Sequence, residues 1–125
     1  MPLLRTSDND LERIQLTDPD EWVEVKRRLG KDDERERSRL INNARVLDAG
    51  GNPVGWETGT LVELATFATM QVAVKRWNVR DPETNRVAPL TARNLRALSD
   101  DDVALIQARF EEMYGEPLTD DDRKN

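Results

Sequence analysis

The chain has 125 residues with a net charge of −6, and it contains neither cysteine nor histidine. This length is typical of one domain, and the missing residue types exclude a disulfide framework, a thiolate nucleophile, a Ser-His-Asp triad and an ordinary zinc site. Residues 100–125 carry nine acidic and three basic side chains, so residues 1–99 are formally neutral. Because the acidic quarter would repel phosphate, we expect no nucleic-acid binding.

The two ends of the chain are polar. We expect residues 1–10 to form a flexible N-terminal arm, residues 11–115 a single globular domain, and residues 116–125 a disordered acidic tail. The first residues lack the apolar run of a signal peptide, and the longest apolar segment is too short to span a bilayer. The sequence therefore predicts a cytoplasmic protein without a membrane contact.

The first elements in the chain are two short runs that alternate with period 2, residues 13–16 and 22–26. This pattern predicts two strands, and the Thr-Asp-Pro-Asp sequence between them is typical of a turn. Val23 and Val25 would face one side of the second strand, with Trp22, Glu24 and Lys26 on the other. We predict a β-hairpin with one buried face that packs on a helix, because a two-stranded hairpin alone is marginally stable.

A charged helix is expected next, capped by Asp32 or Asp33 and running to about Leu47. Asp33–Arg37 and Glu36–Arg39 are spaced to form ion pairs along it. The glycine-rich segment 48–55 then breaks the helix. Residues 46–48 and 53–56 form either a small hairpin around this turn or a plain loop.

The segment from Gly59 to Trp77 is the longest apolar stretch and predicts the core helix, with Thr60 as its cap and two basic residues near its end. Two apolar stripes recur at helical spacing, which indicates burial on two sides. The first stripe comprises Leu61, Leu64, Ala65, Ala68 and Val72, and the second comprises Phe67, Met70, Val74 and Trp77.

Two shorter helices are predicted after an extended segment. Thr91 would cap one that continues through Leu98, and Ser99 would open the last in a sequence that resembles a capping box with Asp102 in place of Glu. Gly115 would end that last helix. The predicted fold class is α+β, mainly helical, with an N-terminal β-hairpin packed on a buried central helix and three further helices.

The possible chemistry is narrow. Carboxylates, lysine and tyrosine remain, yet the acidic clusters lie at helix starts and in the tail, where capping and solubility explain them. Segment 50–55 lacks the Gly-Lys-Ser/Thr ending of a phosphate loop, and Asp48 to Asn52 does not match a calcium loop. We therefore predict no enzyme, no catalytic residue, no metal and no cofactor.

The remaining candidates for function are apolar and aromatic side chains that could contact a protein partner, because aromatic residues anchor interfaces and methionine adapts to irregular surfaces. Two interpretations stay open for the second stripe: it is exposed for a client helix, or it is buried within the monomer, which we favour slightly. The candidate partner-binding residues are Trp22, Trp56, Phe67, Met70, Val74 and Trp77.

Several short blocks in a fixed order suggest a family. They are Trp22-Val23-Glu24-Val25-Lys26, Val74-Lys75-Arg76-Trp77-Asn78-Val79-Arg80-Asp81, Ala88-Pro89-Leu90-Thr91, Asn94-Leu95 and Leu98, within residues 12–114. This layout resembles that of the tail assembly chaperones of long-tailed bacteriophages. The family has no catalytic motif, so no residue role is carried over.

The resemblance implies a protein that binds the tape measure protein, keeps it soluble in the cytoplasm of the infected bacterium, and works with the tail tube subunits. In that family a frameshifted longer form often carries a C-terminal extension. The alternative function is a structural component of the virion, such as a head–tail joining or tail-terminating protein, and an unrelated acidic interaction module is a third. A homo-oligomer is possible in each case.

Overall fold

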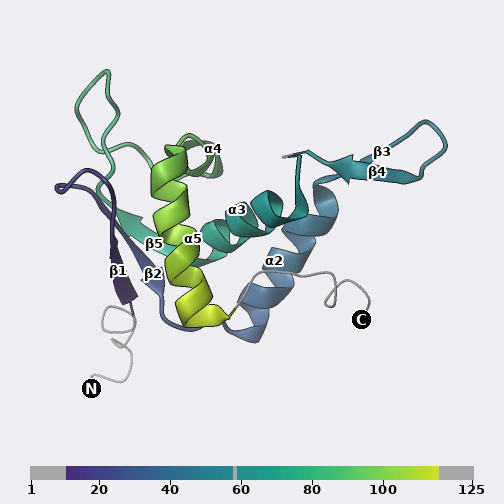
Figure 1. The fold of residues 1–125 in the computed structure, drawn as a ribbon, viewed down its shortest axis with the longest axis horizontal. Helices are drawn as coiled ribbons and strands as arrows, with labels where there is room; N and C mark the ends of the chain where they lie inside the picture. The colour runs from purple at the N-terminus through teal and green to yellow at the C-terminus, as the bar shows by residue number, and fades with distance from the viewer. Residues whose placement is uncertain (1–10, 58, 116–125) are drawn as a thin grey trace.

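The structure is a computed structural model that describes residues 11–57 and 59–115 (Figure 1). In this part of the chain a three-stranded antiparallel sheet and four helices form an α+β fold, as predicted. The predicted arm 1–10 and tail 116–125 lie outside the described residues. The elements are β1 (Leu11–Gln15), β2 (Trp22–Lys26), α2 (Lys31–Asn43), β3 (Arg45–Leu47), β4 (Pro53–Trp56), α3 (Leu61–Ala73), β5 (Val74–Trp77), α4 (Ala92–Arg96) and α5 (Asp100–Tyr114).

The N-terminal hairpin is confirmed. β1 pairs antiparallel with β2, with Ile14 opposite Val23, and both side chains are buried. Val23 and Val25 face the core, as the alternation predicted, and they pack with Met70 near the end of α3. The opposite face of β2 is less open than expected, because Glu24 is also buried there.

The core helix is shorter than predicted. α3 ends at Ala73, and the next four residues form β5, which pairs with β2 and places Trp77 opposite Val23. The prediction that Lys75 and Arg76 lie in the last helical turn is therefore wrong, since both belong to β5. Helical spacing continued through Trp77, but the hydrogen bonds offered by the free edge of β2 override this local preference.

The predicted continuation of the charged helix to Leu47 is also wrong. α2 ends at Asn43, and the small-hairpin interpretation of the following segment is confirmed, since β3 pairs antiparallel with β4. Asp48 stabilises the turn between them because its Oδ1 accepts from the backbone N–H groups of Gly50 and Asn52, each at 2.9 Å. This two-stranded β3–β4 ribbon extends away from the rest of the molecule (Figure 1).

Helix caps agree with the sequence in three places. The hydroxyls of Thr60, Thr91 and Ser99 each accept from the backbone N–H three residues later, at 3.0, 3.1 and 3.2 Å. The cap of α2 differs: the N-cap is Gly30, whose N–H donates to Asp33 Oδ2 at 3.0 Å. Asp33 also forms an ion pair with Lys26 at 2.9 Å, and this replaces the predicted pair with Arg37.

Asp102 differs from the predicted capping box. Its carboxylate does not reach back to Ser99 but accepts from the backbone N–H and the hydroxyl of Thr17, at 2.9 and 2.7 Å. These bonds join the β1–β2 turn to the start of α5 across 85 positions of sequence.

The apolar interior is divided into two clusters. The larger one joins the inner face of the sheet to the end of α3 and to α4 and α5, with Met70 and Ile106 fully buried at its centre. The smaller one holds only five buried residues where α2 crosses the first half of α3: Ile41, Ala44, Leu64, Ala65 and Ala68. The end of the molecule that α2, the first half of α3 and the ribbon form therefore has the smaller apolar core.

An ion pair between β1 and α5 makes stability depend on pH. Glu12 Oε2 lies 2.6 Å from the Arg109 guanidinium, and this hydrogen bond lowers the pKa of Glu12. Because the folded pKa is depressed, the contribution is present above the unfolded pKa and is lost as pH falls through the lower folded value. Glu12→Gln should lower the free energy of unfolding at pH 7, and this difference from the wild type should shrink as pH falls below about 4.5, the ordinary pKa of the carboxyl.

Denaturant titrations between pH 3 and pH 7 measure this difference. Glu83→Gln is the matched control, since Glu83 is exposed on the loop after β5, and its titration curve should follow the wild type at every pH. A Glu12→Gln deficit that stays constant down to pH 3 would show that the charge of Glu12 is not what stabilises the fold.

Candidate protein-binding site

The acidic residues of the described chain include several that contact other parts of the fold, such as Asp33 and Asp102. They contain no cluster of three or more side chains that could hold a metal ion. Among the same residues, no helix combines the length and the apolar character needed to cross a membrane. Asp100 and Asp101 are exposed in the first turn of α5, where they suit the helix dipole, and Asp102 is engaged with Thr17.

The second apolar stripe is buried within the monomer. Met70, Val74 and Trp77 belong to the larger core cluster, and Phe67 is partly buried against it. The open-stripe interpretation is therefore wrong for Met70, Val74 and Trp77, whose burial is confirmed, while Phe67 is covered only in part. Val74 and Trp77 belong to β5 and not to a helix, and they join Met70 in the core between the sheet and α5.

Trp77 and its neighbours fasten the sheet to the loops beside it. The Trp77 indole N–H donates to the carbonyl of Ala88 at 2.8 Å. Asn78 accepts from the backbone N–H of Trp22 and donates to the carbonyl of Asp20, each at 2.8 Å. Trp77 and Asn78, which belong to the sequence block 74–81, thus hold the segment before α4 and the β1–β2 turn against the end of β5.

Trp22 is partly exposed and lies on the face of β2 opposite the buried Val23 and Val25. The Arg13 guanidinium stacks over its ring, 4.1 Å from the centroid. Beside it, the buried carboxylate of Glu24 pairs with Arg13 at 3.0 Å and with Arg76 at 2.8 Å. On this face the charged groups of Arg13, Glu24 and Arg76 therefore lie beside the Trp22 ring.

The β3–β4 ribbon is the most exposed apolar element. Val46, Leu47 and Val54 are 42%, 54% and 62% exposed, although apolar strand residues ordinarily cover a core. The sixth candidate, Trp56, lies at the base of the ribbon, partly exposed and beneath the Arg45 guanidinium at 5.4 Å. A two-stranded ribbon is marginal in water unless something packs on it, so this one suits contact with another molecule.

A hollow of about 420 Å³ opens beside the base of the ribbon. Its floor is one face of α3, from Leu64 to Gln71, and its walls are the end of α2 and the helix α4. Most of its lining surface is apolar, although five of the ten lining residues are polar or charged, including Glu57, Arg93 and Arg96. The lining residues are Leu40, Asn43, Ala44, Glu57, Leu64, Ala68, Gln71, Ala92, Arg93 and Arg96.

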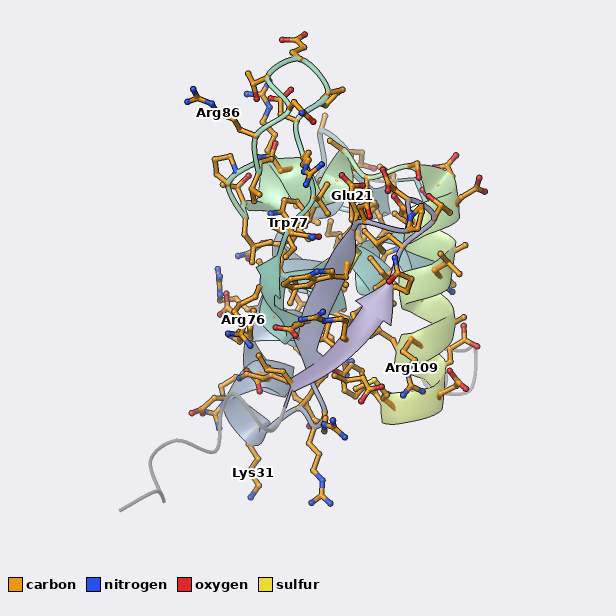
Figure 2. The ribbon with its side chains drawn as sticks, turned by 90° about the vertical axis from the view of Figure 1, so that its left-hand side faces the viewer. Glu21, Lys31, Arg76, Trp77, Arg86 and Arg109 are labelled. Carbon is orange, nitrogen blue, oxygen red and sulfur yellow. The ribbon has the colours of Figure 1, made fainter. Side chains whose placement is uncertain are left out.

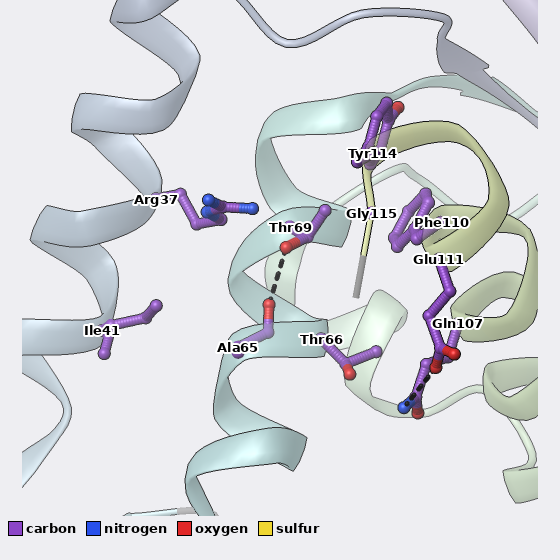
Figure 3. A pocket seen from close by; sticks show the side chains of 10 residues that line it. All are labelled: Arg37, Ile41, Ala65, Thr66, Thr69, Gln107, Phe110, Glu111, Tyr114 and Gly115. Atoms are coloured by element: carbon purple, nitrogen blue, oxygen red, sulfur yellow. Dashed lines mark hydrogen bonds between the residues drawn. The ribbon is translucent and has the colours of Figure 1, made fainter. Parts of the chain in front are cut away.

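A second hollow, on the other side of α3, is a weaker candidate. It is only about 100 Å³ in volume and lies between α2, α3 and α5 (Figure 3). The hydroxyls of Thr66 and Thr69 in its floor donate to carbonyls of their own helix, at 2.9 and 2.8 Å. Gln107 and Glu111 bond to each other at its edge, and Arg37 lines it from the α2 side.

The sequence indicated the β3–β4 ribbon but not the larger hollow between α2, α3 and α4, which we call the groove. Valine and leucine on both sides of a glycine-rich turn, in strands too short to build a core, were the available signal for an exposed apolar ribbon. The groove depends on how three helices pack, which residue spacing does not specify. Comparisons of the chain with protein-family models, curated proteins and solved structures found no match.

Proposed function

We propose that this protein is a bacteriophage tail assembly chaperone that binds the tape measure protein and keeps it soluble in the host cytoplasm until tail tube subunits assemble. The observation that carries the proposal is the exposed apolar ribbon, with Val46, Leu47 and Val54, next to an apolar groove. A client that is long, helical and prone to aggregate needs such a surface to cover its own apolar side chains.

Three other features support this function. The short blocks that resemble the family lie within residues 12–114, which include nearly the whole sheet and the four helices of the described chain. In addition, the net charge of −6 would keep a complex with an aggregation-prone client in solution. The ribbon also stands clear of the larger core cluster, so a client could cover it without disturbing that core.

Co-expression with the phage's tape measure protein tests the proposal. The wild type should yield a soluble complex in a pull-down, and the double variant Leu47→Ser/Val54→Ser should weaken binding at least about tenfold, because two apolar contacts are lost. Leu105→Ser is the matched control, since Leu105 is also exposed but lies on the outer face of α5.

The wild type, the Leu47→Ser/Val54→Ser variant and the Leu105→Ser control should unfold at similar denaturant concentrations, since the altered side chains are exposed. If the wild type leaves the tape measure protein insoluble, assembles alone into a ring and is recovered in purified virions, the protein is a structural virion component and the chaperone proposal is wrong.

A further inference from the structure

The groove between α2, α3 and α4 has features that specify the chemistry of its occupant. Leu64, Ala68 and Gln71 follow one another along α3 at intervals of three or four residues, so the floor extends for about two helical turns, or roughly 10 Å. Alanines in the walls, Ala44 on the α2 side and Ala92 on the α4 side, leave room for a neighbouring side chain to approach closely.

The occupant should be helical. Walls and floor consist mainly of helices, whose backbone groups are bonded internally, so an extended peptide would find few partners for its own N–H and C=O groups. A helix satisfies these groups itself and needs only an apolar stripe to fill the hollow.

The charge at the rim selects among helices. Glu57 is the only acidic lining residue and is already paired with Arg96 at 3.1 Å. Arg93 forms no ion pair within the described part of the chain. The groove therefore has a local excess of positive charge in a protein whose net charge is −6. We propose that it binds one face of an amphipathic partner helix whose apolar stripe is flanked by carboxylates.

This inference rests on the proposed function, because it names the segment of the client that the groove would take. Two helical peptides serve as probes: both carry leucines at positions i, i+3, i+4 and i+7, and one is flanked by glutamates and the other by lysines. Fluorescence anisotropy of labelled peptides gives the dissociation constants, and sedimentation of the free protein gives its oligomeric state. The glutamate peptide should bind more tightly, and rising salt should weaken its binding.

Two variants test the site itself. Arg93→Glu should weaken binding of the glutamate peptide about 3- to 30-fold, because it replaces attraction with repulsion. Ala92→Trp should block the hollow and reduce binding of the glutamate peptide by about tenfold or more. Arg86→Glu is the charge-matched control, since Arg86 lies on the loop at the top of Figure 2, on another element, and it should bind the peptide like the wild type.

The inference is overturned if the two peptides bind equally and neither Arg93→Glu nor Ala92→Trp weakens them. It is also overturned if the occupant is a second copy of the chain. In that case the free protein self-associates, Ala92→Trp abolishes the self-association, and the glutamate peptide does not compete with it. If Ala92→Trp and Arg93→Glu solubilise the tape measure protein as well as the wild type does, the groove is not the client site, although the chaperone function stands. If the wild type fails to solubilise the client, the proposed function itself has failed.

Discussion

Met70→Ala should lower the free energy of unfolding by about 2–5 kcal/mol. The Met70 side chain is 0% exposed and packs with the sheet and α5, so truncating it loses apolar burial and leaves a cavity. Urea denaturation followed by circular dichroism measures the change. The same variant would barely alter stability if the second stripe were an open client surface.

Val62→Ala is the control for this measurement. Val62 lies on the same helix but is 41% exposed, so its truncation should change stability by less than about 0.5 kcal/mol. Equal losses for the two variants would contradict the placement of Met70 in the core.

Asp102→Ala should cost about 2–4 kcal/mol of stability. Asp102 is 7% exposed, and its carboxylate accepts two hydrogen bonds from Thr17. Removing it leaves the Thr17 N–H and hydroxyl without their partner and disconnects the β1–β2 turn from α5, and hydrogen bonds to charged groups are among the stronger ones. Thermal unfolding measures the loss as a lower midpoint temperature.

Asp101→Ala separates this role from a general effect of acids in the first turn. Asp101 is exposed at the preceding position, so its loss removes only a favourable interaction with the helix dipole, about 0.3–1 kcal/mol. Asp102→Asn should lie between the two, because the amide oxygen still accepts a hydrogen bond. An Asp102→Ala protein as stable as Asp101→Ala would rule out the proposed link to Thr17.

The parts of the fold that local chemistry determines could be predicted from the sequence. The hairpin follows from alternation around a Thr-Asp-Pro-Asp turn, and Thr60, Thr91 and Ser99 were identified as caps because capping involves a hydroxyl and a backbone group three residues away. β5 could not be predicted, because it forms only where β2, far earlier in the chain, offers a partner, as Val23 does for Trp77.

The candidate site shows the same limit. Helical spacing grouped Phe67, Met70, Val74 and Trp77 correctly as apolar, but only the packing of the sheet and α5 determines that they are inside. Conversely, Leu47 is exposed because α2 ends at Asn43. The sequence pattern predicted that this helix would continue to about Leu47.

Hydrogen–deuterium exchange of the free protein and of its complex with the tape measure protein tests the central claim most directly. We predict that client binding slows exchange in residues 40–57 and 92–96, which contain the ribbon and the walls of the groove, and leaves the slow exchange of the β2 core unchanged. A complex in which protection appears only on the outer strands of the sheet, or nowhere in residues 40–57, would contradict the account.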